Sequence, residues 1–113
     1  MLPFWEPGNV QQRRVRIISR KTLRDAWAKH RDAEDPLKAW FKETEQATWN
    51  GPEDVRARYP SASIVGNERV VFNVKGNTYR LVVAINYSAH IVFIKFFGTH
   101  AEYNNIDVTK VEP

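Results

Sequence analysis

Three runs of β-branched and aromatic residues fill most of positions 70–97, and a pair of turn-forming residues separates each run from the next. The runs cover 70–74, 78–87 and 90–97, with Gly76-Asn77 and Ser88-Ala89 between them. Two-residue turns join antiparallel strands, because a parallel connection needs a crossover of a dozen or more residues. The second half of the chain therefore predicts a three-stranded antiparallel meander.

The first half of the chain has the period of helices. One apolar stripe recurs at i, i+3, i+4 and i+7 and predicts a helix over about 20–30, with Ser19 as its N-cap. A second stripe follows Asp35-Pro36, a capping residue with proline at the first helical position, and predicts a helix to about residue 48. The residues of the two stripes are Leu23, Ala26, Trp27, His30 and Leu37, Trp40, Phe41, Thr44.

Shorter signals complete the order of elements. A β-branched run at 15–18 predicts a first or edge strand, 53–58 predicts one helical turn, and the Thr99-x-x-Glu102 capping box predicts a last helical turn. This order predicts a single α+β domain over 15–113, with two N-terminal helices on one face of a twisted antiparallel sheet. Residues 1–14 contain two prolines and a glycine without a helix or strand period, so we expect an irregular N-terminal extension there.

The composition limits the class of protein. With 113 residues, 42% of them hydrophobic and 12% aromatic, the chain can build one packed core, which excludes wholesale disorder. The absence of cysteine excludes disulfides, a thiolate nucleophile and a zinc site built on sulfur. No apolar run is long enough for a membrane span and no signal-peptide pattern is present, so we expect a cytoplasmic protein. A formal net charge of +4 is compatible with a polyanionic partner but is weak evidence for one.

The two turns also predict which strand residues lie opposite each other. A two-residue turn at 76–77 places Arg80 opposite Asn73, and one at 88–89 places it opposite Phe97 on its other side. The same turn at 88–89 places Val82 opposite Lys95. Side chains alternate between the two faces of a sheet, so one face is predicted to be apolar and covered by the helices. Its residues are Val70, Phe72, Val74, Tyr79, Leu81, Val83, Ile85, Tyr87, Val92, Ile94 and Phe96.

The opposite face carries Arg69, Arg80 and Lys95 on three neighbouring strands, with no Asp or Glu in this register. Like charges on adjacent strands repel unless an anion lies between them, which predicts an anion-binding site. The alternative is a solvated face that the cations merely keep soluble. His100 and Tyr103 follow directly after the strand that carries Lys95, so we expect them beside the same face.

Four stretches of this sequence resemble HigB-type toxins of bacterial type II toxin–antitoxin systems, which belong to the RelE-like superfamily. They are VRIISRKTLRDAWAKH, the Asp-Ala-Glu-x-Pro-Leu-Lys-Ala-Trp run at 32–40, RYPSASIVGNERVVFNVKGNTYRLVVAINY and IVFIKFFGTHAEYNNIDV. The resemblance covers roughly residues 15–109. Residues 1–14 are an addition to the family pattern, and Asn104 stands where the family often has Asp.

The resemblance implies a compact α+β fold and a ribosome-dependent mRNA endonuclease that inhibits translation and works without a metal or cofactor. It implies mRNA in the ribosomal A site as substrate and the ribosome, including 16S rRNA, as a contact. It also implies a HigA-type antitoxin with a helix-turn-helix as the neutralising partner, so that operator DNA is bound only through the antitoxin. No membrane partner is implied.

Metal-free RNA cleavage needs a base for the 2′-hydroxyl, cations for the phosphorane charge and an acid for the leaving 5′-oxygen. Arg80 and Lys95 suit the charge-stabilising role, and His100 is the best acid or base by its ordinary pKa. Tyr103 can donate a proton or stack on a base. Among the RNA-binding candidates, Arg69 is expected to clamp a neighbouring phosphate. The other RNA-binding candidates are Asn73 and Lys75.

Two other functions stay open at this point. One is a non-nuclease toxin on the same fold that poisons a protein target such as gyrase. The other is an inactive descendant that only binds its antitoxin and co-represses its operon. Of the remaining histidines, His30 closes a helix stripe and His90 begins a strand, so we expect structural roles for both.

Overall fold

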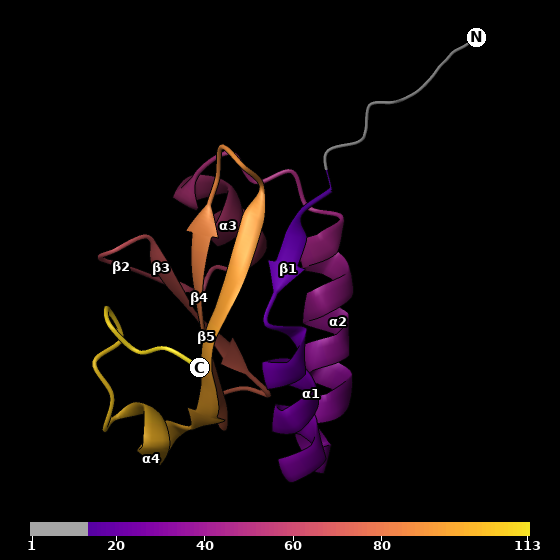
Figure 1. The fold of residues 1–113 in the computed structure, drawn as a ribbon, viewed down its shortest axis with the longest axis vertical. Helices are drawn as coiled ribbons and strands as arrows, with labels where there is room; N and C mark the ends of the chain where they lie inside the picture. The colour runs from indigo at the N-terminus through magenta and orange to yellow at the C-terminus, as the bar shows by residue number, and fades with distance from the viewer. Residues whose placement is uncertain (1–13) are drawn as a thin grey trace, which may run out of the picture.

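Five strands form one sheet in the order β1-β5-β4-β3-β2 (Figure 1). The strands are β1 (Arg16–Ile18), β2 (Ser63–Val65), β3 (Arg69–Val74), β4 (Tyr79–Asn86) and β5 (Ile91–Thr99). The meander β3-β4-β5 is antiparallel, as predicted, and β2 adds a short antiparallel edge strand that the sequence did not predict. Strand β1 forms the other edge and runs parallel to β5. The sheet is therefore mixed, because the helices after β1 return the chain across the sheet.

This computed structural model describes residues 14–113. Apart from Arg14, the predicted extension over 1–14 lies outside the described residues. None of the described helices is long and apolar enough to cross a membrane.

The predicted helices are present, with corrected ends. They are α1 (Arg20–Lys29), a 3-10 turn (Arg31–Ala33), α2 (Glu34–Glu45), α3 (Pro52–Arg58) and α4 (His100–Tyr103). Ser19 precedes α1 in a left-handed conformation, and its side chain makes no capping hydrogen bond. Helix α2 begins before Asp35 and Pro36, so Asp35 is not its N-cap; the proline is tolerated because the first helical N–H groups lack intrahelical partners anyway.

The helices α1 and α2 lie side by side on one face of the sheet, and α4 with the C-terminal segment lies on the other (Figure 1). Leu23 of α1 and Leu37 of α2 are fully buried in the core between helices and sheet. Trp40 of α2 meets Phe72 of β3 edge to face, with 5.5 Å between ring centroids. The core therefore covers the predicted apolar face of the meander and leaves the other face for α4 and the chain end.

The predicted register is correct for β3-β4 and changes within β4-β5. Arg80 lies opposite Asn73, as predicted, and Ile85 lies opposite Val92 near the second turn. A bulge between Val82 and Val83 then shifts the pairing by one residue on β5. The extra residue on the bulged strand reverses the expected faces beyond it.

Beyond the bulge, Arg80 lies opposite Gly98 instead of Phe97, and Val82 lies opposite Phe96 instead of Lys95. Phe97 therefore packs on the helix side, 5.2 Å from the ring of Tyr79, and joins the core. The prediction of Phe96 on the apolar face and Phe97 on the other is wrong for this reason.

Candidate functional site

The face of the sheet away from α1 and α2, here called the open face, carries the predicted cations in two groups. Arg80 lies in a row with Asn73 and Gly98, next to α4. Arg69 lies opposite Ala84, four residues farther along β4, or about 13 Å along an extended strand. The three cations predicted from the register therefore do not form a single cluster.

The first group brings together Arg80, Tyr103, His100 and Asn73, and we call it the α4 corner. The guanidinium carbon of Arg80 lies 5.8 Å from the centroid of the Tyr103 ring. Its Nη1 donates to the carbonyl oxygens of Asn77 and Tyr79, both at 3.2 Å. Asn73 is exposed on the neighbouring strand directly opposite Arg80. The half-buried guanidinium is thus held by the backbone and a ring while one side stays open to solvent.

The capping box that the sequence predicts sets the position of α4. Thr99 Oγ1 accepts from the Glu102 backbone N–H at 3.1 Å, and Glu102 Oε1 accepts from the Thr99 backbone N–H at 2.8 Å. The bond from the Thr99 backbone N–H is the largest effect that holds the pKa of the Glu102 carboxyl below its usual range, and the charge of Lys29 acts in the same direction. The backbone N–H of His100 donates to the Thr78 carbonyl at 3.2 Å and ties the start of α4 to the turn before β4.

His100 is exposed at the first position of α4, and its Nδ1 lies 3.3 Å from Nδ2 of Asn104. The donor and acceptor roles in this contact depend on the tautomer of the His100 ring. The residue that departs from the family pattern is therefore the one that contacts the candidate acid–base histidine.

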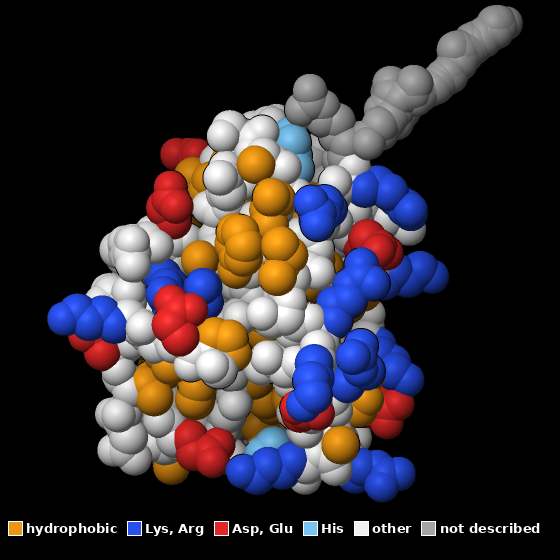
Figure 2. Space-filling view, viewed as in Figure 1, with side chains coloured by type: hydrophobic (Ala, Val, Ile, Leu, Met, Phe, Trp, Pro, Cys, Tyr) orange, Lys and Arg blue, Asp and Glu red, His pale blue; other side chains and the backbone are white. Residues whose placement is uncertain are grey.

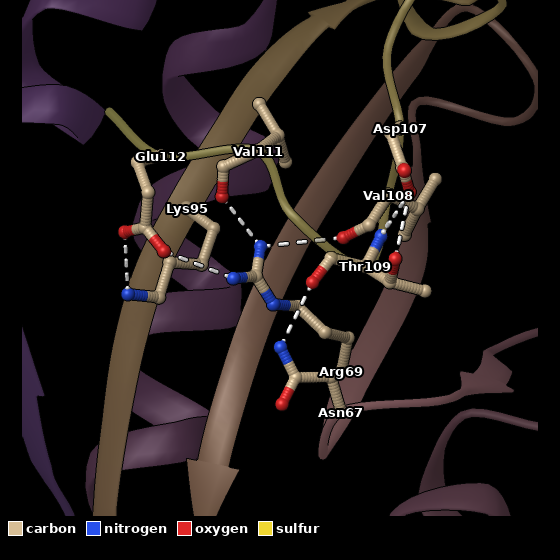
Figure 3. Close-up of polar contacts among 8 residues, drawn as sticks. All are labelled: Asn67, Arg69, Lys95, Asp107, Val108, Thr109, Val111 and Glu112. Carbon is tan, nitrogen blue, oxygen red and sulfur yellow. Dashed lines mark hydrogen bonds and ion pairs between the residues drawn. The ribbon is translucent and has the colours of Figure 1, made fainter.

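The second group lies under the end of the chain, residues 107–113, here called the terminal segment (Figure 3). Arg69 is buried, with 3% of its surface exposed. Its Nη1 donates to the carbonyl oxygens of Val108 at 3.2 Å and Val111 at 2.5 Å. Its Nη2 donates to the Glu112 carboxylate at 3.0 Å. Arg69 is thus occupied by its own chain in this structure and does not stand open for an RNA phosphate.

Lys95 contacts the same carboxylate. Its Nζ lies 2.7 Å from Glu112 Oε1 and 5.5 Å from the centroid of the Phe93 ring, on the open face as predicted. The hydrogen bond from Lys95, followed by the contacts with Arg69, holds the pKa of Glu112 below its usual range. The expectation that no acid faces these cations is wrong, because it considered only the strands and the acid comes from the chain end.

Lys75 lies apart from both groups. Its Nζ donates to Asp32 Oδ2 at 2.8 Å, and the hydroxyl of Tyr79 donates to Asp32 Oδ1 at 2.5 Å. These two hydrogen bonds, with the one from Lys75 the larger effect, lower the pKa of Asp32, and the same carboxylate raises the pKa of Tyr79. Lys75 therefore fastens the β3-β4 turn to the 3-10 turn on the helix side of the sheet.

The other histidines have structural surroundings. The ring of His30 lies 5.0 Å from that of Tyr79 and 6.2 Å from that of Phe97, at the edge of the core. His90 is in the left-handed region at the β4-β5 turn, and its carbonyl accepts from the backbone N–H of Arg16. Within residues 14–113, no three His, Asp or Glu side chains gather as candidate metal ligands.

The structure adds two residues that sequence reasoning missed. Glu112 stands in no periodic element, so nothing local signals its contacts with Arg69 and Lys95. Gly98 lies beside Arg80, where a Cβ would come within 2.6 Å of Phe96 Cζ and 2.7 Å of Glu102 Oε1. A glycine in a β-branched strand that leads into a capping box is a signal for such a close approach.

Comparison with known proteins places this arrangement in a family. The chain is 28% identical over 92 residues to the mRNA interferase toxin HigB of Escherichia coli (strain K12), covering 80% of this chain and 88% of that protein. It shares the same identity and coverage with the mRNA interferase HigB of Shigella flexneri. It is 24% identical over 94 residues to the mRNA interferase HigB of Escherichia coli O6:H1, covering 81% of this chain and 91% of that one.

The family model for the HigB toxin, described as the RelE-like toxic component of a toxin–antitoxin system, matches residues 33–106, which is more than half of the chain. This range contains the meander, the bulge and α4 with its capping box. The observed α+β fold, with its open twisted sheet, agrees with the RelE-like fold that the resemblance implied. The chain accordingly belongs to the family of HigB toxins, the toxic components of toxin–antitoxin systems.

Proposed function

We propose that this toxin is a metal-independent endoribonuclease that cleaves mRNA in the ribosomal A site. The observation that carries the proposal is the α4 corner, where the Arg80 guanidinium is held against the Tyr103 ring at the edge of the open face and the same short helix carries the exposed His100. The names of its relatives, which describe mRNA interferases, support the same reaction.

In this proposal each residue of the α4 corner has one role. Arg80 stabilises the negative charge that develops on the phosphorane, because its guanidinium is held in place before the substrate arrives. His100 transfers the proton at the 2′-hydroxyl or the 5′-oxygen. Tyr103 orients Arg80 and stacks on a base, and Asn73 hydrogen-bonds the RNA beside it.

The remaining candidates act on the RNA strand away from the cleaved bond. Lys95 is partly exposed, with 19% of its side-chain surface open, and is close enough to solvent to pair with a phosphate. Arg69 reaches a phosphate only when the terminal segment moves. Lys75, at the β3-β4 turn, contacts mRNA or 16S rRNA when it gives up its hydrogen bond to Asp32.

Docking on a ribosome requires a surface that attracts RNA. Figure 2 shows Lys and Arg side chains gathered on the side of the molecule where β1, α1 and α2 lie. Arg16 of β1 and Arg24 of α1 are exposed. Such a surface favours association with rRNA phosphates by counterion release. A HigA-type antitoxin, through which alone the toxin would reach operator DNA, completes the proposed system in the cytoplasm.

The test is expression under tight induction with mapping of mRNA 5′ ends. We expect cuts in phase with codons inside translated frames, and their loss in an Arg80→Ala/His100→Ala double variant. Arg56→Ala is the matched control, because it removes an exposed arginine from α3, at the other end of the molecule from α4 (Figure 1). Growth arrest with intact messages would overturn the proposal in favour of a protein-directed toxin, and no arrest by a folded protein would indicate an inactive binding module.

A further inference from the structure

The terminal segment places one carboxylate on two cations of the open face. Glu112 Oε1 accepts from Lys95 at 2.7 Å, and Oε2 accepts from Arg69 at 3.0 Å (Figure 3). The three residues come from β5, β3 and the chain end, and Arg69 and Glu112 are 43 positions apart in the sequence. An anion with two oxygens bridging an arginine and a lysine is also how a phosphodiester is bound in proteins.

We propose that the Glu112 carboxylate occupies a binding site for an RNA phosphate. The terminal segment therefore covers this site, and RNA must displace the segment in order to bind there. The inference rests on the proposed function, since it assigns the regulation of the same open face. In the covered state the carboxylate neutralises Lys95 and Arg69; in the open state a phosphodiester of the bound strand takes its place.

The exposure of Glu112 and the donors of Arg69 are consistent with a terminal segment that can move away from the sheet. The Glu112 side chain is 59% exposed, so water can reach its carboxylate and replace the contacts with the two cations as it leaves. The Arg69 side chain beneath it is 4% exposed, and its Nε has no partner among the described residues. Arg69 therefore has an N–H group left over for a second anion, whereas an arginine with all its donors paired would gain less from exchanging Glu112 for a phosphate.

The position of Lys95 and Arg69 on the sheet determines what RNA gains when it displaces the terminal segment. Arg69 lies on the same open face as Arg80, about 13 Å away as judged from the four residues that separate their rows on β4. That length corresponds to about two or three nucleotides of an extended strand. Lys95 lies on β5 at a level between these two rows, beside Val82 and Val83. Displacing the terminal segment therefore adds a second phosphate contact to a strand held at the α4 corner.

The experiment measures binding of a fluorescein-labelled single-stranded RNA of 12 nucleotides to the full chain by anisotropy, at fixed salt. Glu112→Gln keeps the shape of the side chain and removes its charge. Glu34→Gln is the matched control, because Glu34 pairs with Lys38 at 2.6 Å on α2, away from the open face. Both variants lose one negative charge and one lysine contact, so a general effect of net charge is equal in the two.

We expect Glu112→Gln to bind RNA about three- to tenfold more tightly than the parent chain, as expected if the open state is populated to about 10–30%. Glu34→Gln is expected to change the affinity by less than about twofold. Adding Lys95→Ala to Glu112→Gln is expected to abolish the gain. Equal affinities for the two glutamine variants, or weaker binding by Glu112→Gln in a protein with an unchanged melting temperature, would overturn the inference.

A second measurement distinguishes displacement of the terminal segment by RNA from a segment that is merely less tightly bound in the variant. The backbone N–H of Val111 donates to the Asp107 carbonyl at 2.9 Å, so its NMR signal reports the terminal segment. RNA is expected to shift this signal in the parent chain toward its position in Glu112→Gln. An unmoved signal on saturation with RNA would contradict the exchange even if affinity rises.

Failure of the inference and failure of the proposed function give different patterns. If Arg80→Ala weakens RNA binding while Glu112→Gln has no effect, the open face binds RNA without competition from the terminal segment. If neither Arg80→Ala nor Lys95→Ala changes RNA binding, the open face is not an RNA site and both proposals fall together.

Discussion

The guanidinium of Arg80 and the ring of Tyr103 lie 5.8 Å apart, so the central strand β4 and the last helix α4 meet at the candidate site. A cation above an aromatic face gains about 0.5–2 kcal/mol and loses the rotational freedom of its guanidinium. This contact makes the position of the Arg80 guanidinium depend on a helix of four residues.

Tyr103→Phe and Tyr103→Ala separate the ring from its hydroxyl. Because Phe keeps the ring under Arg80, we expect Tyr103→Phe to cleave RNA within about threefold of the parent, and Tyr103→Ala to lose about tenfold. The measurement is the rate of cleavage of a ribosome-bound message. A loss of about 100-fold or more in Tyr103→Phe would instead identify the hydroxyl as a proton donor.

Asn104→Asp is expected to alter the pH dependence of cleavage. A carboxylate at position 104 would attract positive charge on the neighbouring ring, so a limb of the rate profile that depends on His100 should move to higher pH. Asn105→Asp is the control, because the Asn105 amide donates to the Ala101 carbonyl instead. Equal shifts in the two variants would show that only the added charge matters and that Asn104 does not act on the ring.

Gly98→Ala is expected to destabilise the junction of β5 and α4. The new Cβ would lie 2.6 Å from Phe96 Cζ and 2.7 Å from Glu102 Oε1, so either the ring or the capping box must move. We expect a loss of about 1–3 kcal/mol in the free energy of unfolding, measured by urea denaturation. Gly66→Ala should be close to neutral, since its Cβ would meet only Thr109 Cγ2, at 4.0 Å. Similar losses at both glycines would contradict the packing argument.

Asp32→Asn is expected to lower the melting temperature at pH 7, and the difference from the parent is expected to shrink as the pH falls below about 3.9. The hydrogen bonds from Lys75 and Tyr79 lower the pKa of Asp32 in the folded state. A lowered pKa stabilises the fold above the ordinary pKa of aspartate, about 3.9, and the contribution is lost as the pH falls through the lowered value. A difference between variant and parent that persists at pH 2 would show that packing, and not charge, holds the β3-β4 turn.

Thr44→Val is expected to stabilise the protein. Thr44 is fully buried in α2, and its Oγ1 has no hydrogen-bond partner among residues 14–113. Replacing this hydroxyl with a methyl group removes a desolvation penalty at nearly constant volume, for a gain of about 1 kcal/mol. The exposed Thr48→Val should stay within about 0.5 kcal/mol of the parent in the same urea titration. A clear loss of stability in Thr44→Val would point to a hydrogen bond at this hydroxyl.

Several elements of the fold were predictable because their signals are local. The apolar stripes placed α1 and α2, the Thr99-x-x-Glu102 box placed α4, and the turn at Gly76-Asn77 placed Arg80 opposite Asn73. Each signal acts over one turn of helix or one pair of strands. The α4 corner, which depends on these elements, was therefore foreseen in its members, while its catalytic roles stay a prediction.

The bulge in β5 was not predictable in the same way. The sequence Lys95-Phe96-Phe97 offers two equivalent rings to the core, and only the packing of Phe97 against Tyr79 and His30 selects one of them. This choice decides which residue of β5 faces Arg80 and brings Gly98 there.

The sequence alone determined the class of fold, the number of long helices, the meander and the polar identity of the open face, because periodicity and turn chemistry act between near neighbours. The tertiary structure decided which cations are free. Arg80 stays open beside α4, whereas Arg69 and Lys95 share Glu112, which comes from 43 and 17 residues away along the chain. No local pattern encodes such a pairing, since it exists only when the folded sheet presents two cations to the end of its own chain.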